Sequence, residues 1–154
     1  MTDGDKLLIY IDDKIFAVDA DAVAAVVETE RFFMLPMLQS HSFFRKPGFI
    51  KGVITRRGDV VVVVDIGDLF GAPSVQGEGR YKVLVLKKNA LCLGIYVGAK
   101  GLSFLWEEDL KNLEFKPLTE NYIRGMIDPL GKKIRILDWQ RILEETQRLV
   151  SSRQ

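Results

Sequence analysis

The stretch FIKGVITRRGDVVVVVDIGDLF, residues 49–70, is matched further along the chain by YIRGMIDPLGKKIRILDWQRIL, residues 122–143. The two stretches align without a gap, residue 49 against residue 122, and share glycine and aspartate at the same positions. Self-similarity of this kind indicates that one structural unit occurs twice. We therefore interpret the chain as two approximate copies of a β unit, residues 6–70 and 81–143, joined by a linker at 71–80.

A similar hairpin precedes the aligned stretch in each copy. Residues 7–18 read LLIYIDDKIFAV and residues 82–93 read KVLVLKKNALCL, so two apolar runs flank a short polar turn in each. Apolar runs of this length, bounded by turn residues, predict β-hairpins. The expected strands are 7–11, 15–18, 23–27, 49–54, 60–64, 83–86, 90–97 and a further pair within 122–137.

The segments between these strands are expected to be less regular. Pro36 and Pro47 prevent residues 28–48 from forming one continuous element. Residues 98–121 read as irregular, apart from a short helix at 107–113. From Asp138 onward the apolar residues recur at helical spacing, which predicts a C-terminal helix.

Four glycines at matching positions favour small closed barrels. Gly58 and Gly131 are expected in turns that need a positive φ. Gly52 and Gly125 fall inside strands, where glycine marks a bulge, a bend or a close backbone approach. Many short strands with such bends suit closed barrels, which leave no exposed sheet edge. The predicted fold is mainly β: two small β-barrels packed on a shared apolar core, with a C-terminal helix.

Composition narrows the functional classes. Of 154 residues 47% are apolar, which predicts a packed core, and the formal net charge is only +1. A balanced charge gives no overall field for nucleic acid or an anionic membrane. One cysteine permits no internal disulfide, and the polar, acidic N-terminus does not resemble a signal peptide. We expect a cytoplasmic protein.

The sequence offers little catalytic chemistry. His41 is the only histidine and Cys92 the only cysteine, too few for a zinc site. The two could meet in space as a nucleophile and base, but a buried Cys92 and a solvated His41 are the simpler interpretation. Asp65 and Asp138 repeat because each is placed to cap a helix. No phosphate-binding glycine loop is present, so we expect no enzyme, no cofactor and no metal.

Two groups of residues suggest binding instead. Lys51, Arg56 and Arg57, with Phe43 and Phe44, combine basic and aromatic side chains, as single-strand nucleic-acid binders do. That combination is local, so a small nucleic-acid-binding barrel, or another protein-interaction module, is the alternative function. The aromatic loop 31–49 either fills the seam between the two copies or forms an apolar patch for a partner.

The order and spacing of these motifs resemble the CheW-like family, the coupling proteins of bacterial chemotaxis arrays. The chain departs from that family's pattern at Thr55, Arg56 and Val62, where the family usually has asparagine, leucine and proline. The resemblance spans residues 6–145. It is carried by residues 16–19, 23, 49–53, 57–58, 63–66, 94–97 and 122–143.

The resemblance implies two SH3-like β-barrel subdomains and an adaptor without catalytic activity. Its expected partners are the regulatory domain of a CheA-type histidine kinase and the cytoplasmic tip of chemoreceptors, so contact with the membrane is only indirect. The copy at 122–143 has proline and leucine where the first has Arg56 and Arg57, which points to the basic pair as specialised. The candidate partner-binding residues are Val23, Lys51, Arg56, Arg57, Gly58, Phe43 and Phe44.

Overall fold

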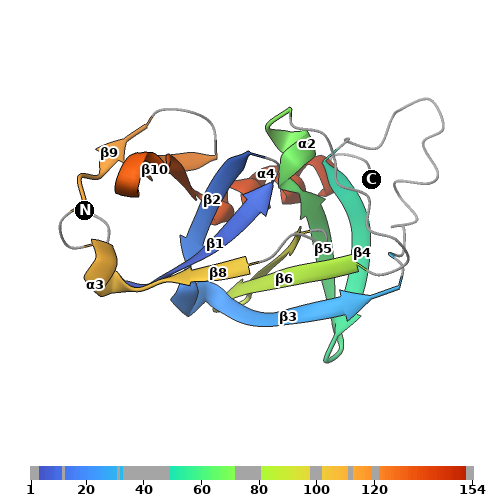
Figure 1. Cartoon of the computed structure of the whole chain (residues 1–154). Coiled ribbons are helices and arrows are strands. Elements are labelled where there is room, and N and C mark those ends of the chain that lie inside the picture. Colours follow the sequence, from blue (N-terminus) through green and yellow to red (C-terminus); the bar gives the residue numbers. More distant parts are fainter. Residues whose placement is uncertain are drawn as a thin grey trace.

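The computed structural model describes residues 4–11, 13–30, 32, 49–71, 81–97, 102–110, 113–118 and 122–151. In this part of the chain the protein is mainly β, with two sheets (Figure 1). The first sheet has the strand order β8 (Leu102–Leu105), β1 (Lys6–Ile11), β2 (Lys14–Asp19), β11 (Ile134–Leu137), β10 (Ile123–Ile127) and β9 (Lys116–Pro117). The second sheet has the order β3 (Val23–Thr29), β6 (Tyr81–Lys88), β7 (Leu91–Tyr96), β5 (Asp59–Asp65) and β4 (Ile50–Arg56).

Among the described residues, helical structure consists of short turns and one longer helix. The longer helix, α4 (Trp139–Ser151), is the C-terminal helix that the sequence predicts. None of the described helices is both long and apolar enough to cross a membrane. The shorter elements are α2 (Ile66–Leu69), α3 (Glu107–Leu110) and the 3-10 turns η1 (Ala20–Ala22) and η2 (Pro129–Gly131).

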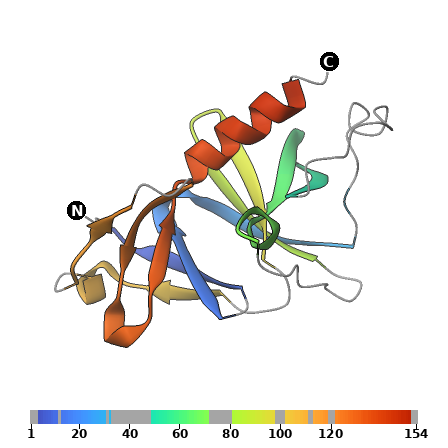
Figure 2. The same ribbon diagram turned by 90° about the horizontal axis from the view of Figure 1, so that it is seen from above.

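Each sheet takes one hairpin from each sequence copy. In the first sheet β11 runs parallel to β2, with Ile136 opposite Ala17. In the second sheet β5 runs parallel to β7, with Val63 opposite Gly94. Figure 2 shows the result, with the orange hairpin β10–β11 beside blue β2 and the yellow-green hairpin β6–β7 beside green β5. The two copies have therefore exchanged hairpins, and neither sheet is built from a single copy.

The repeated glycines within strands occupy corresponding irregularities. The strand register shifts between Ile50 and Gly52 on β4, and between Ile123 and Gly125 on β10. These bulges are the feature that glycine inside a strand predicts. At Gly125 the backbone also approaches a neighbour closely, because a Cβ there would overlap the ring of Phe115.

The repeated aspartates make equivalent hydrogen bonds in the two copies. The Asp65 amide donates to the Phe49 carbonyl at 2.6 Å, and the Asp138 amide donates to the Tyr122 carbonyl at 2.8 Å. Each carboxylate then caps a helix, as predicted. Asp65 Oδ1 accepts from the amide of Gly67 at 2.8 Å at the start of α2, and Asp138 Oδ1 accepts from the Arg141 amide at 3.2 Å in α4.

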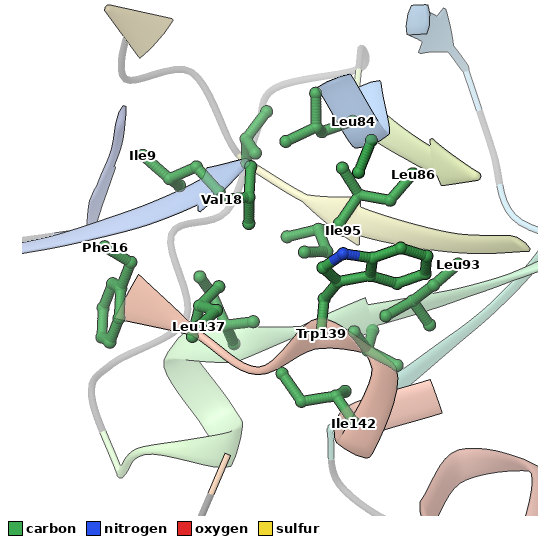
Figure 3. Close-up of a cluster of buried hydrophobic side chains, with 14 of the residues drawn as sticks. Ile9, Phe16, Val18, Leu84, Leu86, Leu93, Ile95, Leu137, Trp139 and Ile142 are labelled. Atoms are coloured by element: carbon green, nitrogen blue, oxygen red, sulfur yellow. The ribbon is translucent and has the colours of Figure 1, made fainter. Parts of the chain in front are cut away.

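One apolar core is shared by the two sheets. Figure 3 shows Trp139 and Ile142 of α4 between Val18 and Leu137 of the first sheet and Leu93 of the second. Two smaller clusters lie apart from this core, one on the first sheet around Ile127, Ile134 and Ile136, and one on the second around Val61, Val63 and Val83. The buried members of the shared core are Ile9, Ile11, Phe16, Val18, Ala22, Val64, Ile66, Leu84, Leu86, Leu93, Ile95, Val97, Ile123, Leu137, Trp139, Ile142 and Leu143.

The segment expected to be irregular is more ordered than its sequence indicates. Strands β8 and β9 lie within residues 98–121, so that expectation is wrong there. Both strands stand at sheet edges, where pairing needs a partner on one side only. The short helix α3 forms as expected and is described over Glu107–Leu110. The sequence also places a turn at residues 87–89, whereas β6 continues to Lys88.

A charged triad joins the two copies beside the shared core. The Lys6 side chain is fully buried, and its Nζ lies 2.7 Å from Asp19 Oδ1. Arg124, from β10 of the other copy, reaches the same oxygen at 3.2 Å. Burial alone would raise the pKa of the Asp19 carboxyl, but hydrogen bonds from Arg124 and Lys6 outweigh it and hold that pKa below its ordinary value.

Asp19→Asn is expected to lower the free energy of unfolding by about 2–4 kcal/mol, because it leaves the Lys6 ammonium buried without its carboxylate. The lowered pKa adds a pH signature. Native stability from Asp19 is present at neutral pH and is lost as the pH falls through the folded-state pKa, below about pH 4. Urea unfolding across pH measures both effects, with exposed Asp21 changed to asparagine as the control. Equal stability of the two variants at neutral pH would contradict the role of the triad.

Gly125→Ala is expected to cost about 1–3 kcal/mol of unfolding free energy, because the new methyl group overlaps Phe115 and would lie 2.9 Å from the Lys116 carbonyl oxygen. Thermal unfolding measures the loss. The double variant with Phe115→Ala removes the ring, so the added methyl group should cost less in that background. The same cost in both backgrounds would show that the ring does not impose the glycine.

Candidate partner-binding surface

The hairpin of β4 and β5 ends in a tight turn that presents two arginines. Arg56 and Asp59 are strand partners at the ends of β4 and β5, which leaves Arg57 and Gly58 as a two-residue loop. Their φ angles are 50° and 83°, and positive φ at both positions is the mark of a type I′ turn. The positive φ predicted for Gly58 is confirmed. Arg57 also lies in the left-handed region, where arginine has no intrinsic preference.

A second hairpin tip lies beside the first. Lys88 pairs with Leu91 at the end of the β6–β7 hairpin. Because β5 and β7 run parallel, the register that sets Val63 opposite Gly94 brings Val60 alongside Leu91. An ion pair joins the tips, since Lys87 Nζ lies 3.9 Å from Asp59 Oδ2.

We call these two tips the hairpin-tip surface: Arg56, Arg57, Gly58, Asp59, Val60, Lys87, Lys88 and Leu91. Four of its side chains are cationic and one, Asp59, is a carboxylate. Val60 is 60% exposed and Leu91 39% exposed, so the surface also offers apolar contact. Cations around exposed aliphatic side chains, held on a paired sheet, suit a protein partner with an acidic and apolar face.

A polar hollow of about 180 Å³ adjoins this surface. Lys87 and Lys88 line it from the second sheet, and Arg124 lines it from the first. Asp138 and Trp139, at the start of α4, form another part of its wall. The hollow therefore lies at the junction of the sheets, where a partner seated on the hairpin tips could also reach the first sheet.

The other predicted site residues lie apart from the basic pair. Val23 begins β3 opposite Leu86, at the same end of the second sheet but on the strand furthest from β4. Lys51 lies at the far end of β4, where its Nζ is 3.6 Å from Asp65 Oδ2 and 5.4 Å from the centre of the Tyr96 ring. Lys51 thus contacts the carboxylate that caps α2. Phe43 and Phe44 fall outside the described residues.

The residues considered for catalysis do not form a site in the described part of the chain. Cys92 is half-buried and packs against the second sheet's apolar cluster. Burial raises the pKa of its thiol, Asp59 adds to that rise, and Lys87 and Arg56 oppose it. A thiol with a raised pKa is a poor nucleophile at neutral pH. His41 lies outside the described residues. The described Cys, Asp and Glu residues form no group able to hold a metal.

Sequence reasoning missed five of the eight residues of the hairpin-tip surface. Lys87 and Lys88 belong to the second copy, and their contribution depends on the parallel pairing of β7 with β5. Val60 and Leu91 end apolar runs and read as core, although both are exposed. The one signal in the sequence was that both hairpins carry paired basic residues near their turns.

Comparison with known proteins agrees with this architecture. The family model described as "CheW-like domain" matches residues 5–147. Among solved structures, the scaffolding protein TtCheW from Thermoanaerobacter tengcongensis superposes with a TM-score of 0.65 at 18% sequence identity. That match covers 89% of this chain and 90% of TtCheW, and it supports the predicted fold of two SH3-like subdomains. No curated protein sequence matches.

Arg57→Asn is expected to raise the free energy of unfolding by up to about 1 kcal/mol, because asparagine before glycine is the favoured type I′ pair. Arg57→Val should lower it, since a β-branched residue resists a positive φ. Urea unfolding of the two variants measures the difference. If the Arg57→Val variant has the same free energy of unfolding as the Arg57→Asn variant, the turn does not impose the strain that its φ angles indicate.

Proposed function

This chain belongs to the CheW-like domain family, and we propose that it is a non-enzymatic cytoplasmic adaptor that couples chemoreceptors to a CheA-type histidine kinase. The observation that carries the proposal is the hairpin-tip surface, which combines exposed cations with exposed aliphatic side chains on a paired sheet. Such a surface binds by shape and charge and needs no reacting group.

Arg56, Arg57 and Gly58 are the proposed centre of the receptor-binding side. Lys87 and Lys88 join them, because the parallel pairing of β5 and β7 brings the two tips together. Arg57 is exposed and forms no ion pair with a described residue, so its guanidinium is available for a carboxylate on the partner. This favours contact with a partner over a role in tying down the turn.

Val23 and Lys51 are proposed as separate contacts. Val23 lies at the margin of the hollow that adjoins the hairpin tips, next to its lining residue Ala22. Lys51 lies about six residues along β4 from Arg57, a distance of about 20 Å in an extended strand. One receptor helix would have to lie along β4 to reach both Lys51 and Arg57. Phe43 and Phe44 stay as proposed contacts of the loop 31–49.

The nucleic-acid alternative receives less support. The cations that nucleic-acid binding would use lie on the hairpin-tip surface, but no aromatic side chain belongs to that surface. An exposed aromatic pair, Phe104 and Trp106, lies at the edge of the first sheet, next to the acidic residues of α3. The exposed aromatic pair is therefore not beside the exposed cations of the hairpin tips, and the ring that Lys51 approaches, Tyr96, is buried. Single-strand binding needs exposed rings and cations together.

Calorimetric titration against a CheA regulatory domain and a chemoreceptor tip fragment tests the proposal. We expect binding to both, with Arg56→Glu/Arg57→Glu weakening the receptor interaction about tenfold or more because it reverses two charges at the interface. The kinase interaction should change less. Lys132→Glu/Lys133→Glu is the matched control, because these exposed lysines directly follow the corresponding turn of the second copy.

Two results would contradict the proposal. The first is absence of binding to both partners by protein whose unfolding curve shows it to be folded. The second is equal receptor binding by the reversed arginine pair and the reversed lysine pair, which would remove the hairpin tips from the interface. A labelled single-stranded oligonucleotide at low salt tests the alternative, because nucleic-acid binding would fall steeply as salt rises.

A further inference from the structure

Two large aromatic side chains stand exposed at one edge of the first sheet. Phe104 is 43% exposed and Trp106 is 60% exposed. Their ring centres lie 4.4 Å apart with the planes tilted by 57°, so the two rings are in contact. We call this pair the aromatic ledge. Paired exposed aromatics at a surface are typical of interaction sites, since each ring buries a large apolar area on binding.

The ledge continues the core-facing side of the first sheet beyond the shared core. Side chains alternate along a strand, so Leu102 and Phe104 face the same side of β8. Leu102 packs against the shared core, whereas Phe104, paired with Leu7 on β1, is largely uncovered. β8 is also the outermost strand of its sheet, and among the described residues nothing pairs with its outer edge.

Acidic groups surround the ledge on the side of α3. Glu107, Glu108 and Asp109 are exposed and follow Trp106 directly. Asp5 is held beside them, because its Oδ1 accepts a hydrogen bond from the Glu107 amide at 2.7 Å. An adjoining hollow of about 480 Å³ is lined by Gly4, Asp5, Asp19, Ala20, Asp21 and Glu107, with no cationic side chain in its lining.

The charge of this region indicates the chemistry of its partner. Asp19 is already paired with Lys6 and Arg124, but the carboxylates around the ledge form no ion pair with any described residue. A cation that approaches the ledge would meet both these carboxylates and the face of an exposed indole, to which cations are attracted. The outer edge of β8, which has no strand partner among the described residues, suits an extended backbone.

We propose that the aromatic ledge binds an extended segment of a partner protein that carries arginine or lysine next to apolar residues. The cation lies over Trp106 and pairs with Glu107, Glu108 or Asp109, while the segment's backbone pairs with the outer edge of β8. This site is on the first sheet and is separate from the hairpin-tip surface on the second. The proposal does not rest on the proposed adaptor function.

A short synthetic peptide of alternating arginine and valine, blocked at both ends, is the direct probe. The chain has two tryptophans, and Trp139 is only 5% exposed, so a change in solvent exposure on binding reports on Trp106. We expect a saturable blue shift of tryptophan emission with the arginine peptide, weakened by salt. A peptide with glutamate in place of arginine should give no shift. No binding of the arginine peptide by folded protein would overturn the proposal.

Calorimetry on variants then assigns the contacts. Trp106→Ala should weaken binding about tenfold, as expected for loss of a cation–aromatic contact, and Trp106→Phe should weaken it less. Glu108→Lys/Asp109→Lys should weaken it by a similar factor through repulsion. The controls are Val26→Ala, an exposed aliphatic change on β3, and Glu144→Lys, an exposed charge reversal on α4. Undiminished binding by Trp106→Ala or by the acidic pair variant would overturn the proposal.

A second copy of this chain is the competing occupant, because its hairpin-tip surface is cationic and apolar. Sedimentation velocity over a range of protein concentrations tests this. If the chain self-associates, and both Trp106→Ala and Arg57→Glu abolish the association while the arginine peptide does not compete with it, the ledge binds the hairpin tips of another copy. That outcome would also overturn the proposal. Normal kinase and receptor binding by Trp106→Ala would show that the two sites act separately.

Discussion

Two parallel strand pairings hold this molecule together. β2 pairs with β11, and β5 pairs with β7, so each sheet is completed by a hairpin from the other sequence copy. Parallel neighbours cannot be joined by a tight turn and require a long crossover. The crossovers here carry the chain from one sheet to the other. Neither copy forms a complete sheet on its own. The two copies must therefore bury their apolar side chains in one shared core.

The exchange also decides which side chains can act together. It brings Lys87 of one copy within 3.9 Å of Asp59 of the other, and so unites two basic hairpin tips. It also brings Arg124 to the Asp19 carboxylate, beside the hollow that Lys87 lines as well, and this partly buried contact holds the first sheet together. The hairpin tips differ in their charge balance, because four cations there face the single carboxylate of Asp59.

The sequence predicted the local features of the fold better than the long-range ones. Gly58 needs a positive φ in its turn, and Asp65 and Asp138 cap helices, all of which depend on residues close in sequence. The two-barrel fold followed from the repeat and from the family resemblance, and it agrees with the matched architecture.

The sequence did not show which hairpins pair with each other in the sheets. Lys51 and Arg57 appear as one basic group in the sequence, but they lie at opposite ends of β4 because the strand is extended. Lys88, remote in sequence, lies closer to the hairpin tip through the register of β7 with β5. Phe104 and Trp106 read as part of an irregular stretch, and their exposure goes with the position of β8 at the edge of the first sheet.

The same strand order has a consequence for the nascent chain. β2 is synthesised long before its neighbour β11, which lies far downstream in the sequence. During translation the hairpin β1–β2 therefore has one edge and its apolar face uncovered until β11 has left the ribosome. Long-range pairing of this kind slows folding and prolongs the exposure of aggregation-prone strand edges. The protein should consequently depend more on chaperones during synthesis than a barrel of similar size whose neighbouring strands follow one another in sequence.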